Sequence, residues 1–82
     1  MPTVDRIDGL RVVIYPNDHR PDHVHVIGAG CEAVLHLNCP EGSPELRENY
    51  GFASGRLSGI KAALTARFTH LCAEWSRIHG IP

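Results

Sequence analysis

The spacing of the hydrophobic residues changes once along the chain, and this change constrains the fold more than any other feature. Up to about residue 49, apolar and polar residues alternate in short segments, which is typical of β-strands. From Ser54 to His79 apolar residues recur every three or four positions, which indicates a single amphipathic helix. Its stripe consists of Leu57, Ile60, Leu64, Phe68, Leu71, Trp75 and Ile78. The two periods together predict an α+β domain.

Three segments of the first half are strong strand candidates because they are rich in β-branched and apolar residues: Leu10–Tyr15, His23–Ile27 and Cys31–Leu37. A lead-in strand around Val4–Ile7 and a short edge strand over Glu45–Glu48 could be added to them. We therefore expect one domain over residues 1–82. It would hold a small antiparallel sheet of three to four strands, with the histidine-rich hairpin, over about residues 4–49. One long C-terminal helix over about residues 54–79 would pack against one sheet face.

Local residues indicate where the helix begins and ends. Ser54 is a suitable N-cap, and Gly80 is a suitable left-handed residue just after the last turn. Tyr50–Gly51–Phe52 places a glycine between two aromatic residues just before the helix, which predicts a tight turn.

Composition narrows the class of protein. Eight basic and nine acidic side chains give a formal net charge of −1, which argues against non-specific binding to polyanions. No apolar run approaches the ~20 residues of a membrane span. The cysteines Cys31, Cys39 and Cys72 are odd in number and form no CxxC pair. With no secretory signal at the start, they predict reduced thiols in a cytoplasmic protein.

The segment Asn17–Val26 contains three of the six histidines, together with two acidic residues and an arginine. Residues two apart on a strand share a face, so His23 and His25 are expected to project together. The intervening Val24 and Val26 would point to the opposite face. This arrangement predicts a polar site on one face of the sheet.

A hairpin turn at Gly28–Gly30 would pair this strand with Cys31–Leu37, and two registers fit the alternation. A two-residue Gly28–Ala29 loop would place His25 beside Glu32. A four-residue loop would instead place His23 opposite His36. Either register enlarges the polar cluster.

Three interpretations of the cluster remain open. In the first, His23 and His25 bind a divalent transition metal such as zinc, nickel or iron. The group that completes the metal site would come from His19, Asp18, Asp22 or His36.

In the second interpretation, His23 with His25 or His36 supplies the base and acid for metal-free chemistry on RNA. His19, on the preceding loop, is a further catalytic candidate. A phosphate would be held by Arg20 or Arg11, and a base could stack on Tyr15.

In the third interpretation the cluster is structural. His19 would cap the turn, and Asp18 would accept hydrogen bonds from loop amides. His23 and His25 would then form a half-exposed strand face that a partner chain covers.

The chain resembles a bacterial family, the domain of unknown function 4160 family, which has an acid–His–x–Pro–Pro–His–x–His pattern after its first strand. The resemblance rests on Asp18–Val26, on Asn49–Tyr50–Gly51–Phe52 before the helix, and on Trp75 followed by His79–Gly80. Two positions depart from the family pattern: Asp22 replaces the usual second proline, and Ala53 replaces a usual capping serine.

The resemblance implies a family whose activity is unassigned and which is suspected of belonging to toxin–antitoxin-like gene pairs. We therefore expect a cytoplasmic regulatory or toxin–antitoxin-type component that acts through a small partner protein, or RNA, at the histidine face. The alternative is a metal-binding enzyme or metalloprotein that uses His23 and His25. A homodimer is compatible with an exposed sheet edge.

Overall fold

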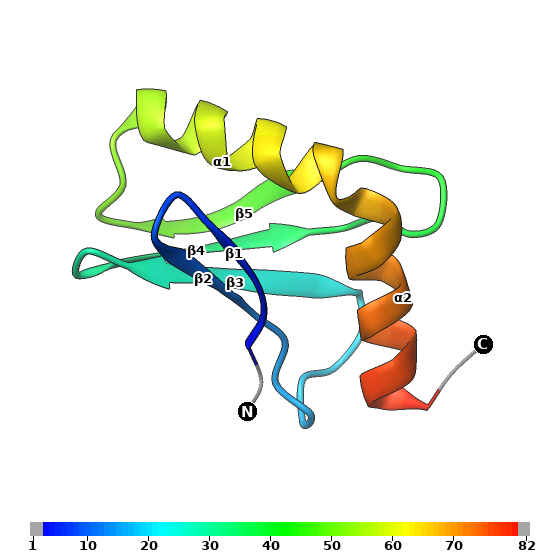
Figure 1. Ribbon diagram of the computed structural model, residues 1–82. Helices are drawn as coiled ribbons and strands as arrows, with labels where there is room; N and C mark the ends of the chain where they lie inside the picture. Colours follow the sequence, from blue (N-terminus) through cyan, green and yellow to red (C-terminus); the bar gives the residue numbers. More distant parts are fainter. Residues whose placement is uncertain (1–2, 81–82) are drawn as a thin grey trace.

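The computed structural model describes residues 3–80, which form five strands followed by two helices (Figure 1). The strands are β1 (Thr3–Ile7), β2 (Leu10–Val13), β3 (His23–Gly28), β4 (Cys31–His36) and β5 (Glu45–Tyr50); the helices are α1 (Ser54–Ala66) and α2 (Phe68–His79). The α+β class is confirmed. The expected count of three to four strands was wrong, because the weak lead-in and edge segments both pair with a neighbour.

The five strands form one antiparallel sheet in which each strand pairs with the next along the chain, in the order β1-β2-β3-β4-β5. Short glycine-containing turns join β1 to β2 and β3 to β4. Because consecutive strands are neighbours, the histidine-bearing β3 lies in the centre of the sheet, and β1 and β5 lie at its edges.

The β3–β4 hairpin adopts the register that places His23 opposite His36. Pairing continues to Gly28 opposite Cys31, so the connecting turn contains only Ala29 and Gly30, two residues fewer than we counted for this register. Both turn residues have positive φ, 53° and 75°. This conformation matches the tight hairpin turn whose twist suits antiparallel strands.

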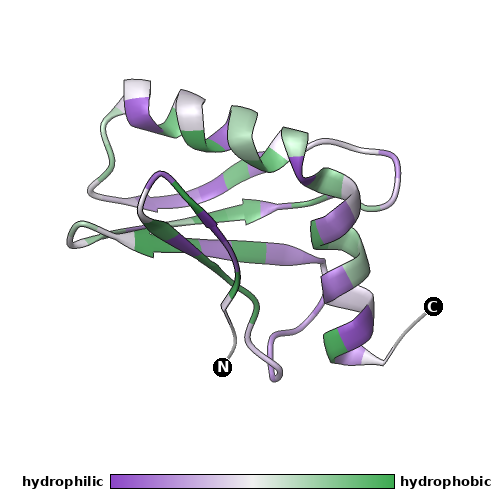
Figure 2. Cartoon of the chain, in the orientation of Figure 1, coloured by the Kyte–Doolittle hydropathy of each residue, from purple (hydrophilic) through white to green (hydrophobic). Residues whose placement is uncertain are grey.

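Alternate residues of the strands point into a core between the sheet and the helices. Val24 and Val26 of β3 have no exposed surface, and they lie in one apolar cluster with Ile60 and Leu64 of α1 and Trp75 of α2. Figure 2 shows the matching alternation of hydrophobic and hydrophilic residues along β3. The side chains of His23 and His25 therefore belong to the opposite face, as the alternation predicted.

The helical region is divided into two helices at Arg67, so the prediction of one long helix was wrong. Arg67 has φ −109° and ψ 14°, and its N–H donates to Leu64 O three residues back. Its guanidinium also lies 3.0 Å from the Asp5 carboxylate of β1. The change of direction takes α2 past the N-terminal end of β3, while α1 lies over the sheet (Figure 1).

The helix ends are partly as expected. The N-cap is Ala53, whose carbonyl accepts from the Leu57 N–H, and Ser54 is the first helical residue, so the Ser54 cap was wrong. Gly80 ends α2 in the left-handed conformation, as predicted. Gly51 also adopts positive φ, 104°, and an added Cβ would lie 3.0 Å from the Cys31 sulfur. The turn before α1 therefore needs glycine.

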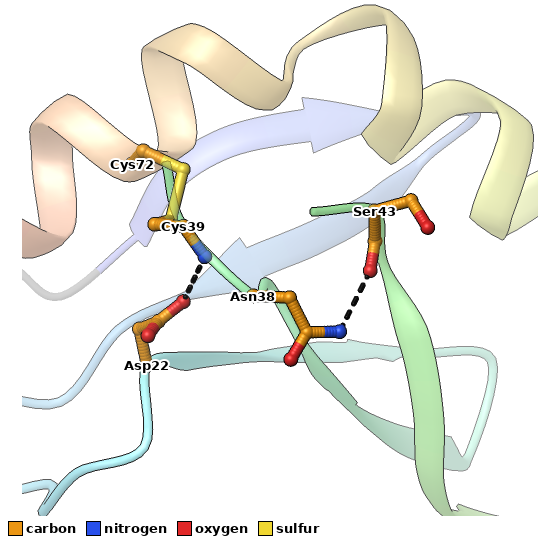
Figure 3. Close-up of a disulfide and its surroundings, with 5 residues drawn as sticks. All are labelled: Asp22, Asn38, Cys39, Ser43 and Cys72. Atoms are coloured by element: carbon orange, nitrogen blue, oxygen red, sulfur yellow. Dashed lines mark hydrogen bonds between the residues drawn. A yellow bond between two sulfur atoms is a disulfide. The ribbon is translucent and has the colours of Figure 1, made fainter. Parts of the chain in front are cut away.

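A disulfide joins Cys39, in the loop after β4, to Cys72 of α2 (Figure 3). The expectation that all three cysteines are reduced was wrong; Cys31 is the free thiol. The two partners are 33 residues apart in sequence, and only the change of direction at Arg67 brings α2 to this loop. Disulfides are rare in reducing compartments, so the bond weakens the argument for a cytoplasmic protein that rested on unpaired cysteines.

Within residues 3–80, neither helix has the length and apolar character needed to cross a membrane.

Candidate metal site

The loop between β2 and β3 begins with a tight turn that fixes Asp18. The Asp18 N–H donates to Tyr15 O over 3.0 Å, and the Tyr15 N–H donates to Asp18 Oδ2 over 3.2 Å. Aspartate favours such turns because its short side chain can accept from nearby backbone amides. The turn therefore holds the Asp18 carboxylate beside the start of β3.

The end of the same loop is fixed by Asp22. The Asp22 carbonyl accepts from the Leu37 N–H over 3.0 Å, and its carboxylate accepts from the Cys39 N–H over 2.9 Å (Figure 3). Cys39 is itself bonded to α2 through Cys72. Asp22 thus anchors the loop and lies outside the cluster described next, although the sequence made it a candidate ligand.

Three side chains converge at the start of β3. Asp18 Oδ2 lies 3.3 Å from His23 Nε2 and 3.3 Å from His25 Nε2. One ligand atom from each of the three residues lies within 4.8 Å of the other two. Their side chains are only 15–17% exposed, so the cluster is partly withdrawn from water.

The other nitrogen of each imidazole is engaged by an acceptor. His23 Nδ1 lies 2.8 Å from the Pro21 carbonyl, and His25 Nδ1 lies 3.0 Å from Glu32 Oε2. A carbonyl or an ionised carboxylate can only accept, so each Nδ1 carries the hydrogen. In the neutral rings, both Nε2 atoms then present a lone pair toward Asp18.

Two lone pairs that face one carboxylate oxygen form a group of three donor atoms that a single divalent cation can accept. His25 Nε2 supports this reading, because it is buried and makes no hydrogen bond to any residue within 3–80. An unpaired buried polar atom is costly, and a cation bound at this point would give His25 Nε2 a partner.

The spacing of the ligand atoms also fits a metal. With bonds of about 2.0–2.1 Å, two ligands of a tetrahedral zinc ion lie about 3.3–3.4 Å apart. Both nitrogen–oxygen separations at Asp18 are 3.3 Å. Two imidazoles and one carboxylate are a set used by zinc and by non-haem iron, with coordination positions left for water or substrate.

Aromatic rings surround the three residues. The Tyr15 ring centroid lies 4.9 Å from that of His25, and the His36 centroid lies 6.4 Å from that of His23. Trp75 of α2 packs against His23 at 5.4 Å. The sequence placed Trp75 only in the core stripe, and nothing in the pattern indicated that α2 would reach the histidine face.

Other candidates from the sequence lie outside this cluster. His19 is exposed on the loop, and Arg20 is exposed beside it. Arg11 lies opposite Ile27, two residues along β2 from the strand pair Val13–His25. The structure therefore brings together Asp18, His23 and His25, with Tyr15 and His36 beside them.

The comparison with known families identifies the chain. The model of the domain of unknown function DUF4160 matches residues 9–76. The chain belongs to this family. The matched range includes all three cluster residues and Trp75, and the resemblance seen in the sequence is confirmed. Searches of curated proteins and of solved structures found no match.

The structure shows what the residues do at the two positions that the resemblance marked as departures. The Asp22 carboxylate accepts from the Cys39 N–H. Ala53 is the N-cap of α1 and provides no side-chain cap. Neither departure alters the three residues of the cluster.

Proposed function

We propose that this DUF4160 protein binds one divalent transition metal through Asp18 Oδ2, His23 Nε2 and His25 Nε2. The observation that carries the proposal is the orientation of the two rings. Both Nδ1–H groups point to acceptors, and both Nε2 atoms point to the same carboxylate oxygen at 3.3 Å. Metal-ligating histidines almost always donate their other N–H to a carboxylate or a backbone carbonyl. Here His23 faces the Pro21 carbonyl, and His25 faces the Glu32 carboxylate.

The neighbouring groups would tune this metal. Glu32 adds a second negative charge, so that one divalent ion with two carboxylates and two neutral imidazoles gives no net charge. Tyr15 and Trp75 restrict the motion of the rings from the sides.

Three protein ligands leave at least one coordination position free. A metal in such a site lowers the pKa of bound water and polarises a substrate oxygen, which is typical of catalytic rather than structural sites. We therefore favour a metalloprotein with an open, catalytic-type site, and metal-assisted hydrolysis is the reaction class that the ligand set suits best.

The test is a zinc titration of tag-free, metal-stripped protein by calorimetry. We expect one zinc per chain for the natural sequence. Asp18→Asn and His25→Ala should each weaken zinc binding at least about tenfold, because each removes or weakens one of three ligands.

The matched control is His19→Ala, which removes an exposed histidine next to Asp18 but outside the cluster. It should bind zinc like the natural sequence. The zinc would lie elsewhere if His19→Ala lost as much zinc affinity as His25→Ala, or if Asp18→Asn bound zinc as tightly as the natural sequence.

A second proposal keeps the expectation of a regulatory or toxin–antitoxin-type role through a small partner protein. It is favoured by β5, an edge strand in which all six residues are exposed. Leu46 of β5 is 43% exposed, and Tyr50 is 58% exposed. An exposed edge can accept a strand from another chain, so β5 is a better partner surface than the histidine face.

This second proposal is tested by recovering the protein from its native host after nuclease treatment, with the bound proteins identified by mass spectrometry. One small protein, retained by His25→Ala but lost by Leu46→Lys/Tyr50→Lys, would support it. Recovery of RNA alone before nuclease treatment, or of a second copy of this chain alone, would contradict it.

A further inference from the structure

An open cavity of about 880 Å³ lies between the β2–β3 loop, the loop after β4 and helix α2. This volume is in the range of small-molecule sites. Its walls include Arg20, Pro21, Asp22, Pro40, Ala73 and Trp75.

Most of this wall is apolar. Pro21, Pro40 and Trp75 contribute rings, and the disulfide of Cys39 and Cys72, which joins the loop to α2, also lines the cavity. Figure 3 shows this disulfide beside Asp22. Such surfaces favour an apolar or aromatic body in the ligand.

The cavity wall contains two charged side chains, Asp22 and Arg20, and only one of them already has a hydrogen-bond partner. The Asp22 carboxylate already accepts from the Cys39 N–H at 2.9 Å. Arg20 is exposed and has no ion-pair partner within residues 3–80. The cavity therefore offers one free guanidinium, which binds carboxylates through paired, charge-assisted hydrogen bonds.

The cavity and the candidate metal site share two walls. Pro21 supplies the carbonyl that accepts from His23 Nδ1, and Trp75 packs on the His23 ring. The same two residues line the cavity. A ligand in the cavity would thus contact both groups that orient His23, without itself touching the cluster.

We propose that this cavity binds a small organic carboxylate with an apolar or aromatic body. Its charge is met by Arg20, and its body packs against the exposed rings of Pro21 and Pro40, next to the edge of the nearly buried Trp75.

The test uses benzoate as the probe and metal-free protein, so that its result does not depend on the proposed metal. Trp75 is the only tryptophan of the chain, so its fluorescence reports directly on the cavity. We expect a saturable fluorescence change with benzoate. Benzamide, which has the same ring without the charge, should bind at least about tenfold more weakly, because a hydrogen bond to a charged group is lost.

Two variants locate the binding. Arg20→Gln should reduce benzoate affinity about tenfold and leave benzamide unchanged. Ala73→Leu fills an exposed wall position and should weaken both probes. The matched control is Arg56→Gln, an exposed arginine of α1 outside the cavity, which should behave like the natural sequence.

Circular dichroism confirms that each variant is folded. A fluorescence response that never saturates, equal affinity for benzoate and benzamide, or undiminished benzoate binding in Arg20→Gln would each overturn the proposal.

Discussion

The two faces of strand β3 are built from alternating residues but have opposite physical roles. Val24 and Val26 have no exposed surface and are held by apolar contact with the core. His23 and His25 keep about 15% of their side chains exposed and are held by polar contacts at Nδ1. Burial of apolar area stabilises the first face, whereas each polar contact on the second gains little net free energy.

Together with the proposed metal site, this difference assigns folding and metal binding to different residues of one strand. Substitutions on the valine face should change stability, and substitutions on the histidine face should change metal affinity. The following predictions test this separation.

The largest expected effect on stability comes from Cys39→Ser/Cys72→Ser. The bond closes a loop with a sequence separation of 33 residues. Loop-closure entropy for this length predicts a loss of roughly 3–4 kcal/mol in the free energy of unfolding. Urea denaturation with and without a thiol reductant measures it, and the reductant should affect only the natural sequence.

Loss of this disulfide should change metal affinity as well as stability. The bond joins the loop anchored by Asp22 to the helix that carries Trp75, which packs on His23. We expect weaker zinc binding in the double variant as well. Unchanged zinc affinity would mean that α2 does not help to position His23.

A smaller loss in the free energy of unfolding is expected for Val26→Ala, which removes two methyl groups from a fully buried site. The transfer and cavity contributions give about 2 kcal/mol. Urea denaturation should show this loss, while zinc affinity of the folded variant stays the same. His25→Ala should show the reverse pattern. If both variants lost stability equally, the histidines would be structural.

On the histidine face, Glu32→Gln tests the group that orients His25. Removing the charge at Oε2 should weaken zinc binding by about 10–100-fold, with little change in the free energy of unfolding. The control is Glu48→Gln on β5, whose carboxylate accepts from the Tyr50 hydroxyl and does not contact His25. A similar zinc affinity in the two variants would remove Glu32 from the site.

The smallest effect is expected on the outer surface of α2, at Glu74 and Arg77. Two hydrogen bonds from Arg77, at 2.7 and 3.1 Å, lower the pKa of the Glu74 carboxyl below its ordinary value. This pair therefore contributes stability above the unfolded pKa of Glu74 and loses it as the pH falls through the lowered folded value. Solvent screening keeps that contribution small.

Arg77→Gln should raise the pKa of Glu74, which a carboxyl NMR titration detects, with almost no change in melting temperature. A Glu74 pKa that stays in place would show that the pair does not persist in solution.

The sequence predicted the site to the extent that strand alternation determines it. His23 and His25 share a face because they are two residues apart. The sequence offered Glu32 beside His25 and His36 opposite His23 as alternatives in two registers. The structure has the His36 register, and Glu32, which pairs with Ile27, still reaches His25 at 3.0 Å. Asp18 could be proposed only as one of several ligands. Its position depends on the turn closed by Tyr15, which alternation does not describe.

Contacts between distant segments could not be predicted in this way. The apolar stripe continues across Arg67, so its period gave no sign that the helix changes direction there. That change brings Trp75 to His23 and Cys72 to Cys39. Both contacts depend on tertiary packing, which overrides the local pattern.

The central claim, that His23 and His25 bind metal together through Nε2, is tested most directly by nitrogen-15 NMR of the imidazole rings during zinc addition. We predict that both rings keep the Nδ1 hydrogen and that both Nε2 signals shift with one zinc per chain. Coordination through Nδ1, or a response from only one of the two rings, would contradict the account.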